Sequence, residues 1–175
     1  MKSEFNANES DVLKGVWELS SSISTDKRGY IWTSFDTNLK KILPSDVSFE
    51  HDKFSLSKHN VLRGIHGDNK SWKLVSCVFG EIMQVVVDLR KDSKTYLKWQ
   101  SFDLEGSINK IILIPPNMGN AFYVKSSEAL YHYKLSYEGE YLDANEQFSL
   151  QWDDEKININ WPTINPTLSE RDEHK

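Results

Sequence analysis

Cysteine is almost absent from this sequence, and its scarcity excludes several kinds of protein. The 175 residues include one cysteine, Cys77, so the chain can form neither an internal disulfide nor a multi-cysteine metal cluster. Cys77 lies in the apolar run WKLVSCVFG. That setting favours a buried structural thiol over a nucleophile, because the three residues on each side of Cys77 carry no positive charge.

Long apolar runs and an excess of positive charge are also missing. No stretch approaches the roughly 20 apolar residues of a membrane span, and the opening segment MKSEFNANESDVLKG is polar. We therefore expect a cytoplasmic protein without a membrane segment or secretion signal. The formal net charge of −5 argues against a nucleic-acid partner, since that affinity comes from clustered Lys and Arg.

Helical periodicity is thin, whereas residues typical of strands are abundant. Only Glu9 to Lys14 and Thr37 to Ile42 could form a helical turn or two. Aromatic residues make up 12%, and they recur in short runs rich in Val, Ile, Tyr and Phe that end at Gly, Asn, Asp or Pro. These runs predict an all-β barrel or jelly-roll sandwich. The expected strands are Gly15–Ser20, Tyr30–Phe35, Val47–Ser57, Val61–His66, Lys73–Cys77, Gly80–Asp88, Lys98–Asp103, Ile111–Ile114, Gly119–Val124, Ala129–Ser136 and Phe148–Gln151.

One domain is expected over residues 1–175, because the length suits a single core. We place that core at about residues 26–162. Residues 163–175 are polar and contain Pro166, which suggests a tail that wraps the surface and then frays.

The segment LRGIH is the strongest single feature in the chain. It places Arg63 and His66 on either side of Gly64 in an otherwise apolar strand. Three positions apart, the two side chains would face opposite sides of a regular strand, and a bulge at Gly64 would change that. Taken alone, one histidine in a strand favours a structural role in the core or at its rim over a catalytic role.

Two further strands carry polar groups at positions that are expected to be buried. Gln84 precedes three valines in GEIMQVVVDL, so its amide needs a structural or substrate partner. In ALYHYKL, Tyr131 and Tyr133 share one strand face. An inward phenol can donate a proton to a carbanion, or can simply be a core aromatic whose hydroxyl is hydrogen-bonded.

Several separated motifs together resemble the deoxysugar epimerase family that includes dTDP-4-dehydrorhamnose 3,5-epimerase. In chain order they are DKRGY, LRGIH, WKLVSCVFGEI, VVVDLRKDSKTYLKW, ILIPPNMGNAF, LYHYK and QWDDEKININWP. The resemblance runs from about Asp26 to Pro162. It implies a cupin-type jelly roll that forms a homodimer by exchanging strands, and an epimerase that acts beside the 4-keto group of a nucleotide-linked sugar.

The resemblance also implies roles for individual residues. His66 matches the family's base, Tyr133 the acid on the opposite face of the sugar, and Asp154 the carboxylate that orients the base. Lys73 matches the lysine near the keto oxygen. No cofactor is implied, because fixed donors can hold the enolate.

Substrate binding is implied at further positions. Arg28 and Arg63 match the residues that hold the diphosphate, and Tyr30 belongs to the same DKRGY motif as Arg28. No metal site is expected, because the five histidines include no H-x-H pattern on one strand.

The chain departs from the family pattern at positions that bear on the substrate. Asn120 stands where the family has a second active-site His, and Gln84 where it has an Asp; both remain candidate substrate contacts. Ile31 and Thr33 replace residues that help the family to read thymine. We therefore expect C3 epimerisation ahead of C5, with a GDP-linked 4-keto heptose for surface polysaccharide such as capsule as the leading substrate.

Three alternatives stay open at this point. One is a dTDP-4-dehydrorhamnose 3,5-epimerase, and another is a ketoisomerase of the same fold. The third is an inactive sugar-binding jelly roll. Incubation with a 4-keto sugar in deuterated water separates them, because only an epimerase returns its substrate skeleton with solvent deuterium and an inverted centre.

Overall fold

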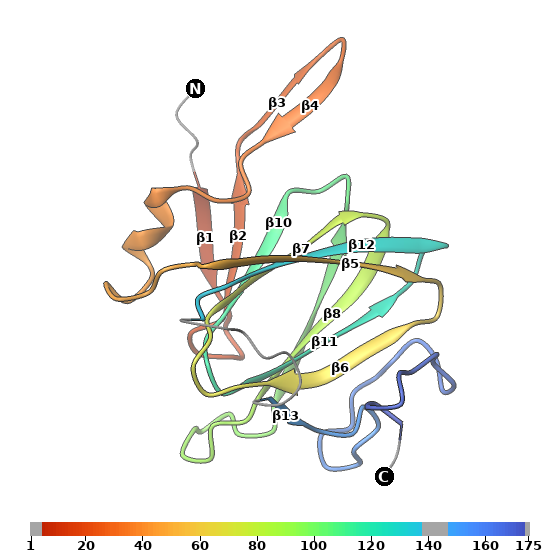
Figure 1. Cartoon of the computed structure of the whole chain (residues 1–175). Coiled ribbons are helices and arrows are strands. Elements are labelled where there is room, and N and C mark those ends of the chain that lie inside the picture. Colours follow the sequence, from red (N-terminus) through yellow and green to blue (C-terminus); the bar gives the residue numbers. More distant parts are fainter. Residues whose placement is uncertain (1–4, 138–146, 174–175) are drawn as a thin grey trace.

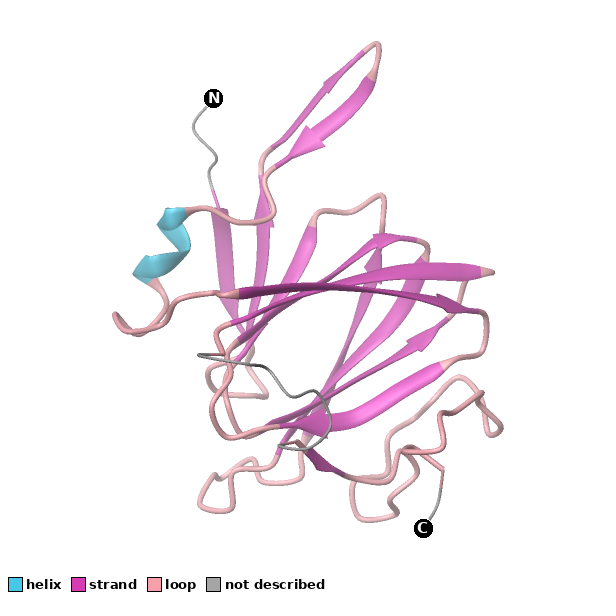
Figure 2. Ribbon diagram, viewed as in Figure 1, coloured by secondary structure: helices cyan, strands magenta, loops and turns pink. Residues whose placement is uncertain are grey.

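The computed structural model of the chain describes residues 5–137 and 147–173, and strands make up most of its regular structure (Figures 1 and 2). One short 3-10 helix, η1 (Thr37–Lys41), begins where the Asp36 side chain accepts the backbone N–H of Asn38. The strands are β1 (Phe5–Glu9), β2 (Trp17–Ser21), β3 (Ile23–Asp26), β4 (Gly29–Trp32), β5 (His51–Lys58), β6 (Leu62–Gly67), β7 (Lys73–Phe79), β8 (Glu81–Asp88), β9 (Trp99–Glu105), β10 (Lys110–Ile114), β11 (Met118–Val124), β12 (Glu128–Leu135) and β13 (Phe148–Ser149).

Two antiparallel sheets face each other and form a jelly roll, as the strand pattern predicts (Figure 1). One sheet has the order β1-β2-β10-β7-β12-β5, and the other has the order β13-β6-β11-β8-β9. Strands β3 and β4 form a separate hairpin that projects from the body (Figure 1). The all-β expectation and its cupin-type jelly-roll class are thus confirmed.

The core lies between the sheets and follows the alternation of each strand. In β8, Ile82 and Val86 pack inside with Tyr131 of β12, whereas Met83, Val85 and Val87 pack on the outer face of the same sheet. Because side chains alternate with period two, Gln84 shares the inner face with Ile82 and Val86. A polar group in the middle of this core is the first sign of a site between the sheets.

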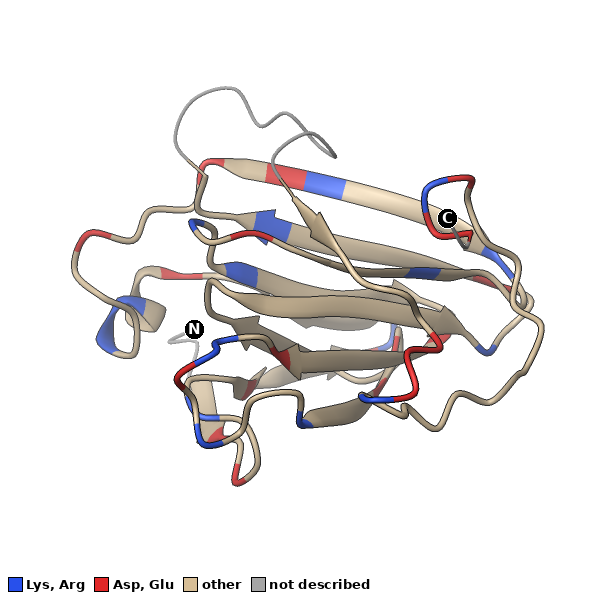
Figure 3. Cartoon of the chain, turned by 90° about the horizontal axis from the view of Figure 1, so that it is seen from below, with Lys and Arg blue, Asp and Glu red and all other residues tan. Residues whose placement is uncertain are grey.

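Segments at the two ends of the described chain cover the outer faces. Trp152, Ile157 and Leu168 pack against the outer face of the sheet that contains β6 and β8. Leu39 of η1 packs with Leu19 on the other sheet. Figure 3 shows acidic and basic residues interspersed along strands and loops, which agrees with a modest net negative charge.

Several boundaries differ from expectation. Strand β1 falls in the polar N-terminal segment, where Phe5 and Ala7 alternate with two asparagines and pack on the core, and no strand was expected there. The expected helical turn at Glu9 to Lys14 is a non-helical turn. The expected turn at Thr37 to Ile42 is confirmed as η1. The C-terminal segment runs over the outer face of the sheet that contains β6, where Leu168 packs and Thr167 forms a parallel bridge with Val61. The limits of the domain core and of its tail stay predictions.

No helix in the described residues is both long and apolar enough to cross a membrane.

Candidate active site

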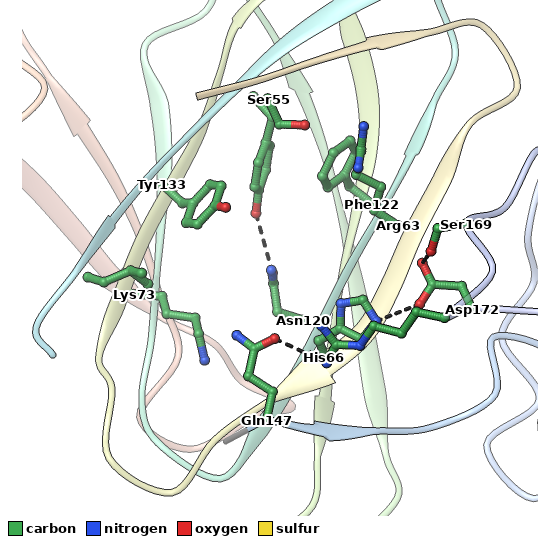
Figure 4. A pocket seen from close by; sticks show the side chains of 13 residues that line it. Ser55, Arg63, His66, Lys73, Asn120, Phe122, Tyr133, Gln147, Ser169 and Asp172 are labelled. Carbon is green, nitrogen blue, oxygen red and sulfur yellow. Dashed lines mark hydrogen bonds and ion pairs between the residues drawn. The ribbon is translucent and has the colours of Figure 1, made fainter. Parts of the chain in front are cut away.

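A pocket of about 360 Å³ opens between the two sheets, and most of the side chains predicted for catalysis gather there (Figure 4). His66 and Arg63 reach it from β6, and Tyr133 reaches it from β12 on the opposite sheet. Lys73 of β7 and Asn120 of β11 also line it. The fold therefore brings together predicted site residues that are up to 70 positions apart, as the difference between Arg63 and Tyr133 shows.

A bulge at Gly64 places Arg63 and His66 on the same face of β6. His66 pairs with Asn120 of β11 and Arg63 pairs with Phe122, so three steps along β6 oppose two along β11. Gly64 has a φ of 121°, and a Cβ there would lie 2.5 Å from the Cβ of Ala121. Only glycine fits this bulge, and the expectation that Gly64 redirects the two side chains is confirmed.

His66 is held by a carboxylate from the far end of the chain. Its Nε2 lies 2.5 Å from Oδ1 of Asp172, whose other oxygen accepts the Ser169 hydroxyl at 3.0 Å. Burial raises the pKa of Asp172, but the hydrogen bonds from His66, Ser169 and the Gly64 N–H, with the His66 charge, outweigh burial and hold this pKa below its ordinary value. Asp172 is therefore ionised at neutral pH and fixes the proton of His66 on Nε2, which leaves the Nδ1 lone pair free to act as a base.

The prediction that Asp154 orients His66 is wrong, because His66 pairs with Asp172. Asp154 does not line the pocket; its carboxylate accepts the backbone N–H of Lys156 at 2.8 Å in a turn on the outer side. Asp172 takes the position that the resemblance implies for Asp154. Little in the sequence indicates this, because Asp172 lies in a segment without strand periodicity, but its spacing three residues after Ser169 suits a local hydroxyl-carboxylate pair.

Lys73 enters the pocket as half of a buried ion pair. Its Nζ donates to Oδ2 of Asp68 at 2.9 Å, and the two side chains are only 5% and 3% exposed. Burial raises the pKa of Asp68, but the Lys73 charge and the N–H groups of Ser71 and Lys70 lower this pKa below its usual value. Asp68, which sequence reasoning missed, keeps the ammonium in place and leaves two of its N–H groups for other partners.

Two tyrosines of β12 face the pocket, as their alternation predicts. Tyr133 lines it from the sheet opposite His66, with its ring centroid 5.8 Å from that of Tyr131. Tyr131 is 1% exposed, and burial raises the pKa of its phenol far above the usual range. The less buried Tyr133 is thus the better placed of the two to exchange a proton with a bound molecule.

Asn120 and Gln84, the two replaced positions, contact each other. The Gln84 Nε2 donates to Oδ1 of Asn120 at 2.6 Å. Asn120 lines the pocket, but Gln84 is fully buried and lies behind it. The structure therefore does not bring the Gln84 amide to the pocket surface, and Gln84 reaches the pocket through Asn120.

The hairpin residues lie apart from the pocket within one chain. Arg28 is exposed at the hairpin turn and pairs with Asp26 at 2.5 Å, and the Tyr30 hydroxyl donates to the Gly106 carbonyl at 3.0 Å. Neither side chain lines the pocket of its own chain, so their predicted contact with substrate stays a prediction. Arg63, which donates to the Ser57 hydroxyl at 3.0 Å, does line it, and so does Arg171, a cation that sequence reasoning missed.

Metal-binding groups are sparse around this site. Among residues 5–137 and 147–173, no three His, Cys, Asp or Glu side chains come close enough to form a metal centre. The expectation of a metal-free reaction stays a prediction.

The fold and the pocket define a class: a jelly-roll protein with a histidine-carboxylate pair and a phenol facing each other across a sugar-sized cavity. Residues 10–175 match the family model of dTDP-4-dehydrorhamnose 3,5-epimerase. The enzyme of that name from Salmonella typhimurium is 34% identical over 166 residues, which cover 92% of this chain and 89% of that protein.

Two other relatives extend the comparison. The dTDP-4-dehydrorhamnose 3-epimerase of Streptomyces niveus is 32% identical, with coverage of 92% and 78%. The dTDP-6-deoxy-D-glucose-3,5-epimerase of Legionella pneumophila, solved in complex with dTDP-4-keto-L-rhamnose, superposes with a TM-score of 0.89 at 30% identity and covers 97% and 90% of the two chains. The chain belongs to the dTDP-4-dehydrorhamnose 3,5-epimerase family, and it is a carbohydrate epimerase.

Proposed function

We propose that this enzyme inverts C3 of a dTDP-linked 4-keto-6-deoxy sugar, with His66 as base and Tyr133 as acid. The observation that carries the proposal is the position of these two groups on opposite sheets of one pocket, with the Lys73 ammonium beside them (Figure 4). An epimerase needs two such groups on opposite faces of the sugar ring, because the proton leaves one face and returns to the other.

The reaction divides into two proton transfers. His66 Nδ1 takes the proton from the carbon beside the ketone, and the C–H electron pair moves to the carbonyl oxygen to form an enolate. Asp172 stabilises the resulting imidazolium. The Tyr133 phenol then protonates the opposite face of the same carbon, and the ketone is restored.

Lys73 supplies a charge where the enolate oxygen needs it. Its buried pairing with Asp68 fixes the ammonium without using all of its donors. A preorganised donor of this kind stabilises the charge that develops in the transition state, which removes the need for a cofactor in this scheme.

The nucleotide is proposed to be dTDP, because the family and the relatives reported above are enzymes of dTDP sugars. A GDP-linked 4-keto heptose is the second candidate, and one observation favours it: Ile31, 70% exposed on the hairpin, and Thr33 replace the residues expected to read thymine. Titration of the protein with dTDP and with GDP in parallel decides between them. Binding of dTDP at least about tenfold tighter supports the proposal, whereas tighter binding of GDP overturns it.

A homodimer is proposed to complete the site. Phe54 and Leu56 of β5 are 63% and 61% exposed. The hairpin that carries Arg28 projects from the body of the fold (Figure 1), and Arg28 does not line the pocket of its own chain. A second copy packed on this apolar face would bring its Arg28 to the pocket of the first. If so, mixing inactive His66→Asn and Arg28→Ala proteins after partial unfolding restores part of the activity, because each mixed dimer holds one intact site. No restoration, or a monomer by sedimentation, overturns the dimer.

The chemistry is tested by deuterium exchange. The wild-type protein is incubated with dTDP-4-keto-6-deoxyglucose in deuterium oxide, and His66→Asn is compared with it. Incorporation at C3 that is lost in the variant supports His66 as base; a variant that exchanges within about tenfold of wild type assigns the base elsewhere.

A further inference from the structure

The amide of Asn120 is locked in one orientation by a chain of hydrogen bonds that begins at a backbone carbonyl. Gln84 Nε2 donates to the Val85 carbonyl at 3.0 Å and to Asn120 Oδ1 at 2.6 Å. The Tyr131 hydroxyl donates its one proton to Gln84 Oε1 at 2.8 Å, and it lies 3.3 Å from Asn120 Oδ1. Gln84 is fully buried and Tyr131 is 1% exposed, so water does not compete for these bonds.

The donor and acceptor pattern permits only one arrangement. A carbonyl oxygen can only accept, so the Val85 carbonyl requires the nitrogen of the Gln84 amide to face it. That nitrogen in turn requires the oxygen of Asn120 on its other side. Turning either amide over would place two acceptors or two donors within 3.0 Å of each other.

We infer that Gln84 and Tyr131 are positioning residues that turn the Asn120 Nδ2 toward the pocket as a fixed neutral donor to the substrate's enolate oxygen. With its Oδ1 engaged by Gln84, Asn120 has its NH₂ group left for the pocket that it lines. Figure 4 shows Asn120 entering the same cavity as Lys73 and His66. The inference rests on the proposed function, because the oxygen in question exists only if an enolate forms.

A neutral donor differs in kind from the ammonium beside it. The charge of Lys73 is balanced by Asp68 at 2.9 Å, so the ammonium acts partly as one member of a buried pair. The Asn120 amide has no titrating group to lose or gain a proton, so its contribution does not depend on pH. A donor that acts on charge present only in the transition state raises kcat and leaves KM nearly unchanged.

The test compares Asn120→Ala, Gln84→Glu and the double variant by deuterium exchange over a range of substrate concentrations, which gives both kcat and KM. Asn120→Ala is expected to lower kcat by about 10²-fold with KM within about threefold, as for the loss of one oxyanion donor. In Gln84→Glu, the carboxylate draws the Asn120 NH₂ toward itself and turns an acceptor to the pocket, so a loss of about tenfold or more is expected. When Gln84→Glu is added to Asn120→Ala, its further effect is expected to be less than about twofold.

The matched control is Gln100→Glu, which makes the same change on β9, where the Gln100 Oε1 accepts the Ser10 hydroxyl outside the pocket. Circular dichroism and thermal unfolding report whether each variant folds. If the buried glutamate prevents folding, Gln84→Met provides the same comparison without a charge.

Two results overturn the inference. The first is an Asn120→Ala variant whose exchange rate is within about threefold of wild type. The second is a Gln84→Glu change that lowers the exchange rate by the same factor in the Asn120→Ala background as in the wild-type background. A wild-type protein that exchanges no deuterium would instead reject the proposed function, so the two failures are distinguishable.

Discussion

Two side chains of the pocket, His66 and Asn120, are each oriented by one hydrogen-bonding partner, and the two partners differ in charge. His66 is held by an ionised carboxylate, Asp172, from an irregular segment 106 positions away along the chain. Asn120 is held by a neutral amide, Gln84, from a neighbouring strand in the same sheet. The first pair can move a proton, whereas the second can only direct a hydrogen bond.

In the proposed scheme, this difference separates proton transfer, by the charged pair, from stabilisation of the enolate oxygen, by the neutral pair. The resemblance predicts a His at position 120 and an Asp at position 84. This chain has Asn120 and Gln84 there, and their side chains are hydrogen-bonded to each other, so the two positions form a pair that carries no charge. In the proposed mechanism, proton transfer is left to His66 on one sheet and Tyr133 on the other. The neutral pair explains why we expect one inversion to be favoured over two.

Removal of the proposed base, His66, should cause the largest loss of deuterium exchange. His66→Asn is expected to lower C3 exchange by about 10³-fold, because general base catalysis is lost while the fold remains. The rate is measured by proton NMR in deuterium oxide. His59→Asn is the control, since His59 is in an exposed turn where its Nδ1 lies 3.1 Å from the Lys125 carbonyl. Equal losses in the two variants would show a general effect on folding.

Removal of the orienting charge should have the next largest effect. Asp172→Asn replaces an acceptor by an amide whose NH₂ favours the wrong tautomer of His66, so exchange is expected to fall by about 10²-fold while nucleotide affinity stays within about threefold. Asp154→Asn, a carboxylate in an outer turn, is the matched control and is expected to act like wild type. The reverse order of the two variants would restore Asp154 as the partner.

Loss of the Lys73 counter-ion should reduce activity and stability together. Asp68→Asn leaves a buried ammonium without its charge partner, so we expect exchange to fall about tenfold and the free energy of unfolding to fall by about 3 kcal/mol. Asp88→Asn provides the comparison, because Asp88 is buried and pairs with Arg90 at 2.8 Å outside the pocket. It should lower stability and leave the rate constant of the folded enzyme unchanged. Denaturant unfolding and exchange kinetics separate the two effects.

The smallest expected effect is on the free energy of unfolding: it should depend on pH through the His66–Asp172 pair and not through the Asn120–Gln84 pair. The pKa of Asp172 lies below its ordinary value in the folded protein. Asp172 therefore stabilises the fold above the unfolded pKa of about 3.9, and this contribution is lost as the pH falls through the lower folded pKa. The stability difference between wild type and Asp172→Asn should shrink below about pH 4. Gln84→Met should show a difference that does not vary with pH, and a pH-dependent difference would contradict a neutral pair.

Much of this site follows from local sequence rules. The alternation of β8 places Gln84 in the core, the alternation of β12 places Tyr133 in the pocket, and Gly64 signals the bulge beneath His66. These features depend on strand period and on backbone sterics, which a sequence reveals directly.

The partners of these residues do not follow from the sequence. Asp172 and Asp154 both lie in segments without periodicity. Asp172 reaches His66 because the C-terminal segment packs on the outer face of the sheet that contains β6. Likewise, the asparagines and glutamate of strand β1 conceal the alternation of Phe5 and Ala7 and the pairing with β2, because these polar residue types are uncommon in strands.

The central claim is that the pocket inverts one carbon by exchanging its proton with solvent. Proton NMR of dTDP-4-keto-6-deoxyglucose incubated with the wild-type protein in deuterium oxide tests it most directly, with the GDP-linked 4-keto heptose as a parallel sample. We predict deuterium at C3 of the dTDP sugar ahead of any at C5. Comparable incorporation at C3 and C5 would contradict the single inversion, and no incorporation in either sample would contradict the epimerase chemistry itself.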